Sequence, residues 1–122
     1  MRPNAYSTRN EAREERKRQV LAAGLVSDRL PEVSSIVVTM NYKRGNSPWV
    51  LRTLNFYPGS AAFFRISCLG EGCDDGGLDL TQVMHRMIKG HEKSAKGKLS
   101  CDNKDAAIVH PHVDYEVAIT YS

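Results

Sequence analysis

Two stretches in which apolar and more polar residues alternate constrain the fold of this chain most strongly. The first covers residues 36–43 and the second covers residues 113–121. A period of two residues places alternate side chains on opposite faces of a β-strand, so both stretches are predicted to be strands with one buried face. Because antiparallel sheets often have one solvated face, this pattern favours an antiparallel sheet over a parallel one.

Further strands are predicted on either side of these stretches. Residues 49–56 and 61–68 follow the first strand after short turns that contain glycine and proline. Three strands joined by such turns predict an antiparallel meander. A short strand around residues 98–101 precedes the last strand, and residues 91–97 are predicted to be a basic linker.

Two helices are predicted from spacing and from end signals. Residues 80–89 carry an apolar stripe at helical spacing, with Asp79 placed as the N-cap and Gly90 just past the end. Residues 9–23 contain no proline or glycine, and Thr8 with Glu11 matches a capping box. Charges of alternating sign fill the first half of this helix, which is typical of a helix stabilised in water.

A length of 122 residues allows one domain with one core. We expect a flexible leader over residues 1–8 and a single α+β domain over residues 9–122. Its antiparallel sheet would have about five strands and two helices, in the order αβββαββ. No apolar run approaches the roughly 20 residues of a membrane-spanning helix, and the N-terminus lacks a secretory signal. We therefore expect a cytoplasmic protein with no membrane partner.

Three cysteines and two nearby histidines offer the donor atoms of a structural zinc site. Such a site needs four thiolate or imidazole ligands in a tetrahedron. We predict Cys68, Cys73, Cys101 and His112 as the ligands, with His110 as the alternative fourth ligand. An odd number of cysteines argues against a closed set of disulfides. The alternative interpretation is that the cysteines simply pack as small apolar residues.

The loop between Cys68 and Cys73 is rich in glycine, and it leads towards a predicted helix. A phosphate could bind at such a helix start, but acidic residues in and after the loop would repel it, and no nucleotide-binding pattern is present. The acidic residues also lack the spacing of a calcium-binding EF-hand. Neither site is predicted.

A nucleic-acid-binding module, in particular for RNA, is the second interpretation. The net charge of +3 permits it. The order helix, three strands, helix over residues 9–89 is that of a double-stranded-RNA-binding domain, although acidic residues replace that family's lysines at the start of the second helix. The basic face of such a module would consist of Arg52, Arg65, Arg86, Lys89, Lys93, Lys96 and Lys98.

Neither a nucleophile elbow nor another catalytic motif is present in the sequence. We therefore expect a small non-enzymatic binding or adaptor protein with a protein partner of unknown identity and a structural zinc ion. The nucleic-acid-binding module is the alternative, and an enzyme whose polar site the sequence does not reveal is the third possibility.

Overall fold

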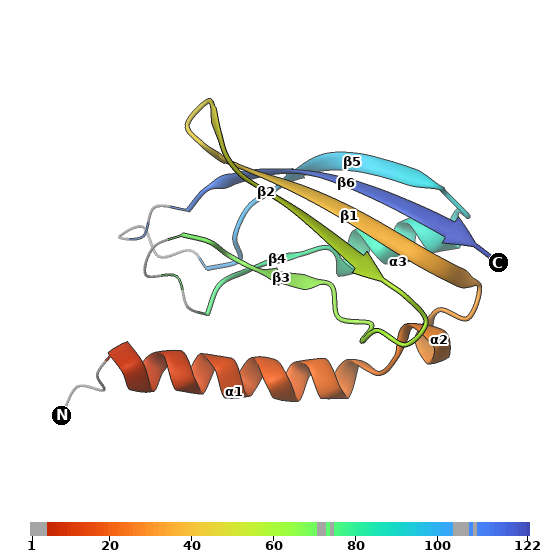
Figure 1. Ribbon diagram of the computed structural model, residues 1–122, viewed down its shortest axis with the longest axis horizontal. Helices are drawn as coiled ribbons and strands as arrows, with labels where there is room; N and C mark the ends of the chain where they lie inside the picture. Colours follow the sequence, from red (N-terminus) through yellow and green to blue (C-terminus); the bar gives the residue numbers. More distant parts are fainter. Residues whose placement is uncertain (1–4, 71–72, 74, 104–107, 109) are drawn as a thin grey trace.

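A four-stranded antiparallel sheet dominates the computed structural model of the protein (Figure 1), which describes residues 5–70, 73, 75–103, 108 and 110–122. The elements, in chain order, are α1 (Ala5–Ala23), α2 (Val26–Arg29), β1 (Val33–Arg44), β2 (Ser47–Phe56), β3 (Arg65–Ser67), β4 (Gly77–Asp79), α3 (Thr81–Lys89), β5 (Ser94–Leu99) and β6 (His112–Tyr121). The predicted α+β class is confirmed.

The strands of the main sheet run in the order β2-β1-β6-β5. The two stretches with the clearest alternation, β1 and β6, are its central pair, and Ile36 of β1 lies opposite Ile119 of β6. On the other side of β1, Ile36 lies opposite Phe56 of β2. The strongest periodicity in the sequence therefore marks the strands that have a hydrogen-bonded neighbour on both sides.

The predicted three-stranded meander is wrong. Only Arg65–Ser67 of the predicted third strand is a strand, and it pairs with β4 in a separate two-stranded sheet. The next strand of the main sheet is instead β6, the last strand of the chain, which pairs with β1 and not with β2. The side chains of Phe64, Ile66 and Cys68 are buried at every second position, so alternation correctly indicates an extended segment with one buried side. It does not reveal which strand this segment pairs with, because pairing is non-local.

The hydrophobic core lies on one face of the main sheet, which α3 and the β3–β4 pair cover (Figure 1). The buried side chains of the two central strands are Ile36, Val38, Met40, Tyr42, Val113, Tyr115, Val117 and Ile119. Met84 and Met87 of α3 are fully buried against them. The predicted apolar stripe of this helix is thus confirmed, although Val83 is only partly buried. The other sheet face has no helix over it (Figure 1).

The ends of α3 differ in detail from the prediction. The helix begins one residue late, and Asp79 Oδ1 accepts a hydrogen bond from the Thr81 amide at 2.9 Å. Gly90 has a φ of −89°, whereas the left-handed conformation falls on His91, with a φ of 52°. The His91 ring stacks on Tyr121 with 3.9 Å between ring centroids, and this contact fixes the residue in a conformation that would otherwise favour glycine.

Part of the predicted linker, residues 94–97, instead belongs to β5. Gly97 lies opposite Tyr115 of β6. A Cβ atom at this position would lie about 2.8 Å from the Tyr115 hydroxyl, so glycine is needed because the tyrosine ring covers the strand. A glycine inside a strand often marks such a close approach.

The described side chains of the first helix contribute nothing to the hydrophobic core. The helix begins at Ala5, four residues before its predicted start, because the Thr8 and Glu11 pattern falls inside the helix and does not mark its beginning. None of the described side chains of α1 is buried, and Leu21 is 83% exposed. Gly24 follows the helix with a φ of 77°. In the described part of the chain, no helix is long and apolar enough to cross a membrane.

Candidate metal centre

Three cysteines and one histidine converge at the end of the molecule where β3 and β5 finish and β6 starts (Figure 1). Cys68 follows β3, Cys73 lies in the loop before β4, Cys101 follows β5 and His110 precedes β6. Their donor atoms all lie within 4.8 Å of one another. The three cysteines are buried and not disulfide-bonded, and together with the partly buried Ile108 they form a cluster separate from the main core.

One hydrogen bond between backbone groups and one to a side chain join the segments that follow Cys73 and Cys101. The Asp102 amide donates to the Gly77 carbonyl at 2.9 Å, and the Gly77 amide donates to Asp102 Oδ1 at 3.0 Å. Asp102, the residue after Cys101, is therefore held next to Gly77. On the other side of Cys73, its amide donates to the Gly70 carbonyl at 3.0 Å.

Gly76 leaves room for the sulfur atoms. A Cβ atom at this position would collide with the Sγ atoms of both Cys73 and Cys101. The backbone here passes directly over the two thiols, which only glycine permits without displacement. The sequence contains two adjacent glycines at 76 and 77. The contact between Gly76 and Cys101 joins residues that lie far apart in the chain, and it was not predicted.

Each of two sulfur atoms accepts a hydrogen bond from the amide two residues further on. The Gly70 amide donates to Cys68 Sγ at 3.4 Å, and the Asn103 amide donates to Cys101 Sγ at 3.4 Å. Such donors stabilise negative charge on sulfur and orient a thiolate that binds a metal. Cys68 and Cys101 therefore each have one such amide donor.

His110 completes the group. Its Nδ1 atom lies 3.5 Å from Cys68 Sγ. Its Nε2 atom is buried and has no hydrogen-bond partner among the described residues. Nδ1, which faces Cys68 Sγ, is the ring atom placed to coordinate a metal ion shared with the cysteines.

The protein environment favours neutral thiols as long as no cation is present. Burial raises the pKa of Cys73 to about 12, with further contributions from Cys101 and Cys68. Burial also raises the pKa of Cys68, although the Gly70 amide partly opposes this rise. A metal ion would have to displace protons from these groups, because only thiolates are metal ligands.

Arg65 of β3 braces the two loops from outside the cysteine cluster. Its Nε and Nη2 atoms donate to both carboxylate oxygens of Asp102 at 2.7 and 2.9 Å, and Nη2 also donates to the Asp75 carbonyl at 2.7 Å. The Arg65 guanidinium lowers the pKa of the Asp102 carboxyl group. A Cβ atom on Gly77 would lie 2.8 Å from this arginine side chain. Arg65 thus links the segment after Cys73 to the residue after Cys101, a role that spacing alone does not indicate.

His112, the preferred fourth ligand in the sequence-based prediction, does not belong to the group; the alternative, His110, does. His112 is the first residue of β6, where Val113 points into the core. Since side chains alternate along a strand, His112 points to the opposite, exposed face. The alternation of apolar and polar residues in the last strand already indicated that His112 and Val113 point to opposite faces.

The residues of the predicted basic face are distributed over different surfaces. Arg52 lies on the inner side of β2 and Arg65 contacts the cysteine loops, whereas Lys96 and Lys98 lie on the outer face of β5. Lys93 precedes β5, and Arg86 and Lys89 are exposed on α3. This placement, together with the absence of the predicted meander, does not favour the nucleic-acid-binding alternative.

No protein-family model, curated protein or solved structure gives a significant match to this chain.

Proposed function

We propose that this chain is a small non-enzymatic binding or adaptor protein in which a structural zinc ion joins three loops through Cys68, Cys73, Cys101 and His110. The observation that carries this proposal is the convergence of these four donor groups within 4.8 Å of one another. The donors come from three separate stretches of chain, so a bound ion would connect the end of the two-stranded sheet to the end of the main sheet.

Two of the distances within the group suit a tetrahedral ion. Zinc–sulfur bonds of about 2.3 Å and zinc–nitrogen bonds of about 2.0 Å, at tetrahedral angles, separate two sulfurs by about 3.8 Å and a sulfur from a nitrogen by about 3.5 Å. The Cys73 and Cys101 sulfurs are 3.7 Å apart, and Cys68 Sγ is 3.5 Å from His110 Nδ1. The Cys3His donor set is also one that structural zinc sites use.

A structural role is favoured over a catalytic one because the protein would supply all four ligands. Catalytic zinc sites usually keep one position open for water or substrate, and the buried cysteines leave little room for either. A cytoplasmic location is part of the same proposal, because free thiols that bind metal are typical of reducing compartments. The partner of the binding module would be another protein.

Cobalt substitution tests this site. A tetrahedral cobalt(II) ion bound by thiolates gives intense visible absorption and a sulfur-to-metal charge-transfer band. We expect metal-free protein to develop both with one equivalent of cobalt and to lose both when zinc is added. The Cys73→Ser variant should bind much more weakly. Ser100→Ala, which alters an exposed neighbour of Cys101, is the matched control and should behave as wild type.

Chelation tests the structural role separately. If zinc joins the loops, its removal should lower the melting temperature and increase amide exchange around residues 68–77 and 100–103, while the central strands stay protected. A protein that takes up no cobalt, or whose melting is unchanged by chelation, would contradict the proposal.

A further inference from the structure

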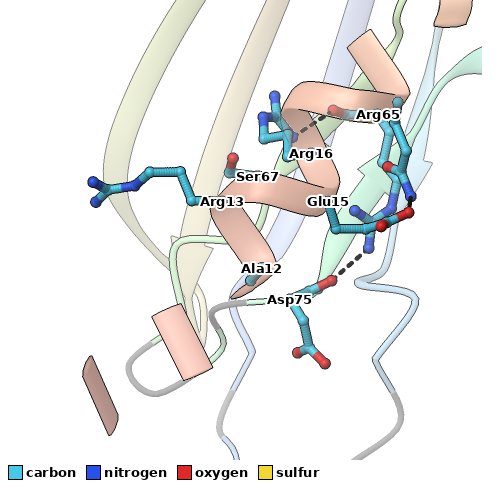
Figure 2. Close-up of a pocket in the computed structure, with 9 residues that line it drawn as sticks. Ala12, Arg13, Glu15, Arg16, Arg65, Ser67 and Asp75 are labelled. Atoms are coloured by element: carbon cyan, nitrogen blue, oxygen red, sulfur yellow. Dashed lines mark hydrogen bonds between the residues drawn. The ribbon is translucent and has the colours of Figure 1, made fainter. Parts of the chain in front are cut away.

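A groove of about 490 Å³ lies between α1 and the segments that carry β3 and the Cys73 loop (Figure 2). Arg13, Arg16 and Gln19 line it from the helix, and Arg65, Ser67 and Gly76 line it from the opposite side. The volume falls within the range of about 300–1,000 Å³ that small-ligand sites occupy. The groove is separate from the cysteine cluster, although Gly76 contributes to both.

Three arginines line this groove, Arg13 and Arg16 from α1 and Arg65 from β3. Arg16 donates from Nη1 to the Arg65 carbonyl at 3.1 Å, and its guanidinium lies 5.1 Å from the centre of the Phe63 ring. Burial, followed by the nearby charges of Arg65 and Arg52, lowers the pKa of Arg16. Positive charges have thus been placed near Arg16, at a cost in electrostatic repulsion.

The nearby carboxylates are engaged elsewhere. Glu15 accepts hydrogen bonds from Arg18, at 2.6 and 3.1 Å, and from Gln19. Asp75 Oδ1 accepts a bond from the Asn103 amide group at 3.0 Å, and Asp102 is bound to Arg65. Among the described residues, neither Arg16 nor Arg52 forms an ion pair with a carboxylate. The groove therefore carries positive charge that the described part of the protein does not neutralise.

The position of Arg16 is fixed before any ligand arrives. The Arg65 carbonyl and the Phe63 ring hold its guanidinium over the groove, while Figure 2 shows Arg13 extending away from Arg16 and Arg65. A planar guanidinium has several donors in a fixed arrangement and suits the oxygens of phosphate and carboxylate groups. Because only one of the donor atoms of Arg16 is engaged in a described hydrogen bond, the others are available to a ligand.

We propose that this groove binds a ligand that carries a phosphate or carboxylate group, with Arg16 as its main partner and Arg13 and Arg65, which also line the groove, as supporting charges. Binding relieves the repulsion between the arginines, because an oxyanion between them replaces like-charge contacts with opposite-charge contacts. A single oxyanion fits better than a nucleic-acid backbone, since Glu15 and Asp75 at the edges of the groove would repel the phosphates on either side.

A titration with inorganic pyrophosphate and, separately, with succinate tests this proposal on the zinc-loaded protein at constant ionic strength. The Nε–H signals of the arginines, followed by NMR, report binding at individual side chains. We expect saturable shifts at Arg16 with one or both probes. The probe that binds more tightly shows whether phosphate or carboxylate is preferred.

Three variants locate the site. Arg16→Gln should weaken binding by about tenfold or more, as expected for the loss of a charge-assisted hydrogen bond. Arg13→Gln removes the other positive charge that α1 contributes to the groove and should weaken binding by a smaller factor. Arg86→Gln, an exposed change on α3 outside the groove, is the control and should stay within about twofold of wild type. Circular dichroism and zinc content of each variant separate a loss of binding from a loss of fold or metal.

Several results would overturn the proposal. One is the absence of saturable shifts with both probes, and another is unchanged affinity in the Arg16→Gln variant. A third is a short single-stranded RNA that binds more tightly than either probe and with a steep dependence on salt, because that result would assign the basic surface to a polyanion.

Discussion

The main core and the cysteine cluster are stabilised in different ways. Among the described residues, seventeen buried side chains form the first. Most come from the two central strands, from α3 and from the segments that contain the β3–β4 pair, and Val26 and Leu30 come from α2 and its C-terminal end. The second contains only three buried cysteines, with Ile108 packed against them. Burial of apolar area contributes roughly 25 cal/mol per Å², so the main core has ample driving force and the small cluster has little. The protein thus has a region that apolar packing can hold alone and a region that needs a further bond.

This difference also explains the positions of Gly76 and Arg65. In the main core, side chains fill the space and set the distance between elements. Around the cysteines, the backbone itself closes on the sulfurs at Gly76, and the Arg65 side chain links the loops by hydrogen bonds. We infer that these polar links hold the loops near the geometry that a zinc ion requires.

The largest effect on stability should come from the main core. Met84→Ala removes a fully buried side chain of α3 and should lower the free energy of unfolding by about 2–5 kcal/mol. Urea denaturation measures the loss, which should be the same with and without zinc if the two regions are independent. A cost that disappears in metal-free protein would contradict this separation. Arg86→Ala, an exposed change on the same helix, is the control.

The affinity of the cysteine cluster for zinc should depend on pH. The raised pKa values of Cys73 and Cys68 mean that both thiols are protonated at neutral pH in metal-free protein. Zinc binding therefore releases protons, and its affinity should rise by about tenfold per pH unit for each proton displaced below the thiol pKa. Competition titrations with a chromophoric chelator between about pH 6 and 8 measure this slope. An affinity independent of pH would exclude the thiols as ligands.

Gly76→Ala should damage the cysteine cluster by crowding it. The added methyl group must displace the Cys73 and Cys101 sulfurs, and overpacking of this kind costs about 1–3 kcal/mol. Zinc affinity should fall while the packing of the main core is retained. Gly59→Ala is the matched control, because open space surrounds that position. Equal effects of the two substitutions would show that the close approach at Gly76 is unimportant.

Removal of the Arg65 brace should have a smaller effect. Arg65→Gln breaks the two hydrogen bonds from the arginine to Asp102. Because both bonds are partly exposed to solvent, we expect the free energy of unfolding to fall by about 1 kcal/mol and zinc to be released faster. Stopped-flow transfer of the metal to a chelator measures the release rate. Arg18→Gln removes an exposed pair within α1 and should leave that rate unchanged.

Local patterns in the sequence predicted the elements of the main core but not their arrangement. The alternation in β1 and β6 and the apolar stripe of α3 depend only on neighbouring residues, and the structure confirms them. The pairing of β3 with β4, and of β1 with β6, depends on contacts between distant segments that no local pattern specifies. For that reason the predicted single sheet is in fact a four-stranded and a two-stranded sheet.

The three cysteines of the cluster could be predicted from the sequence, but the choice of histidine and the residues that support the cluster could not. The three cysteines stand out because they lie at strand ends and in a glycine-rich loop, and the structure brings them together. The choice between His110 and His112 depends on where β6 begins, since a shift of one residue reverses the face of each side chain. The roles of Arg65 and Gly76 could not be recognised in advance, because Asp102 and Cys101, which these residues contact, lie more than twenty residues away from them in sequence.

The zinc content of the purified protein tests the central claim most directly. Elemental analysis of protein prepared without chelators should find one zinc per chain in the wild type and in His112→Ala, and much less in His110→Ala. The two histidines are two residues apart, so the pair of variants separates coordination from a general effect of losing an imidazole. Wild-type protein without stoichiometric zinc, whose melting temperature does not change when zinc is added, would contradict the account.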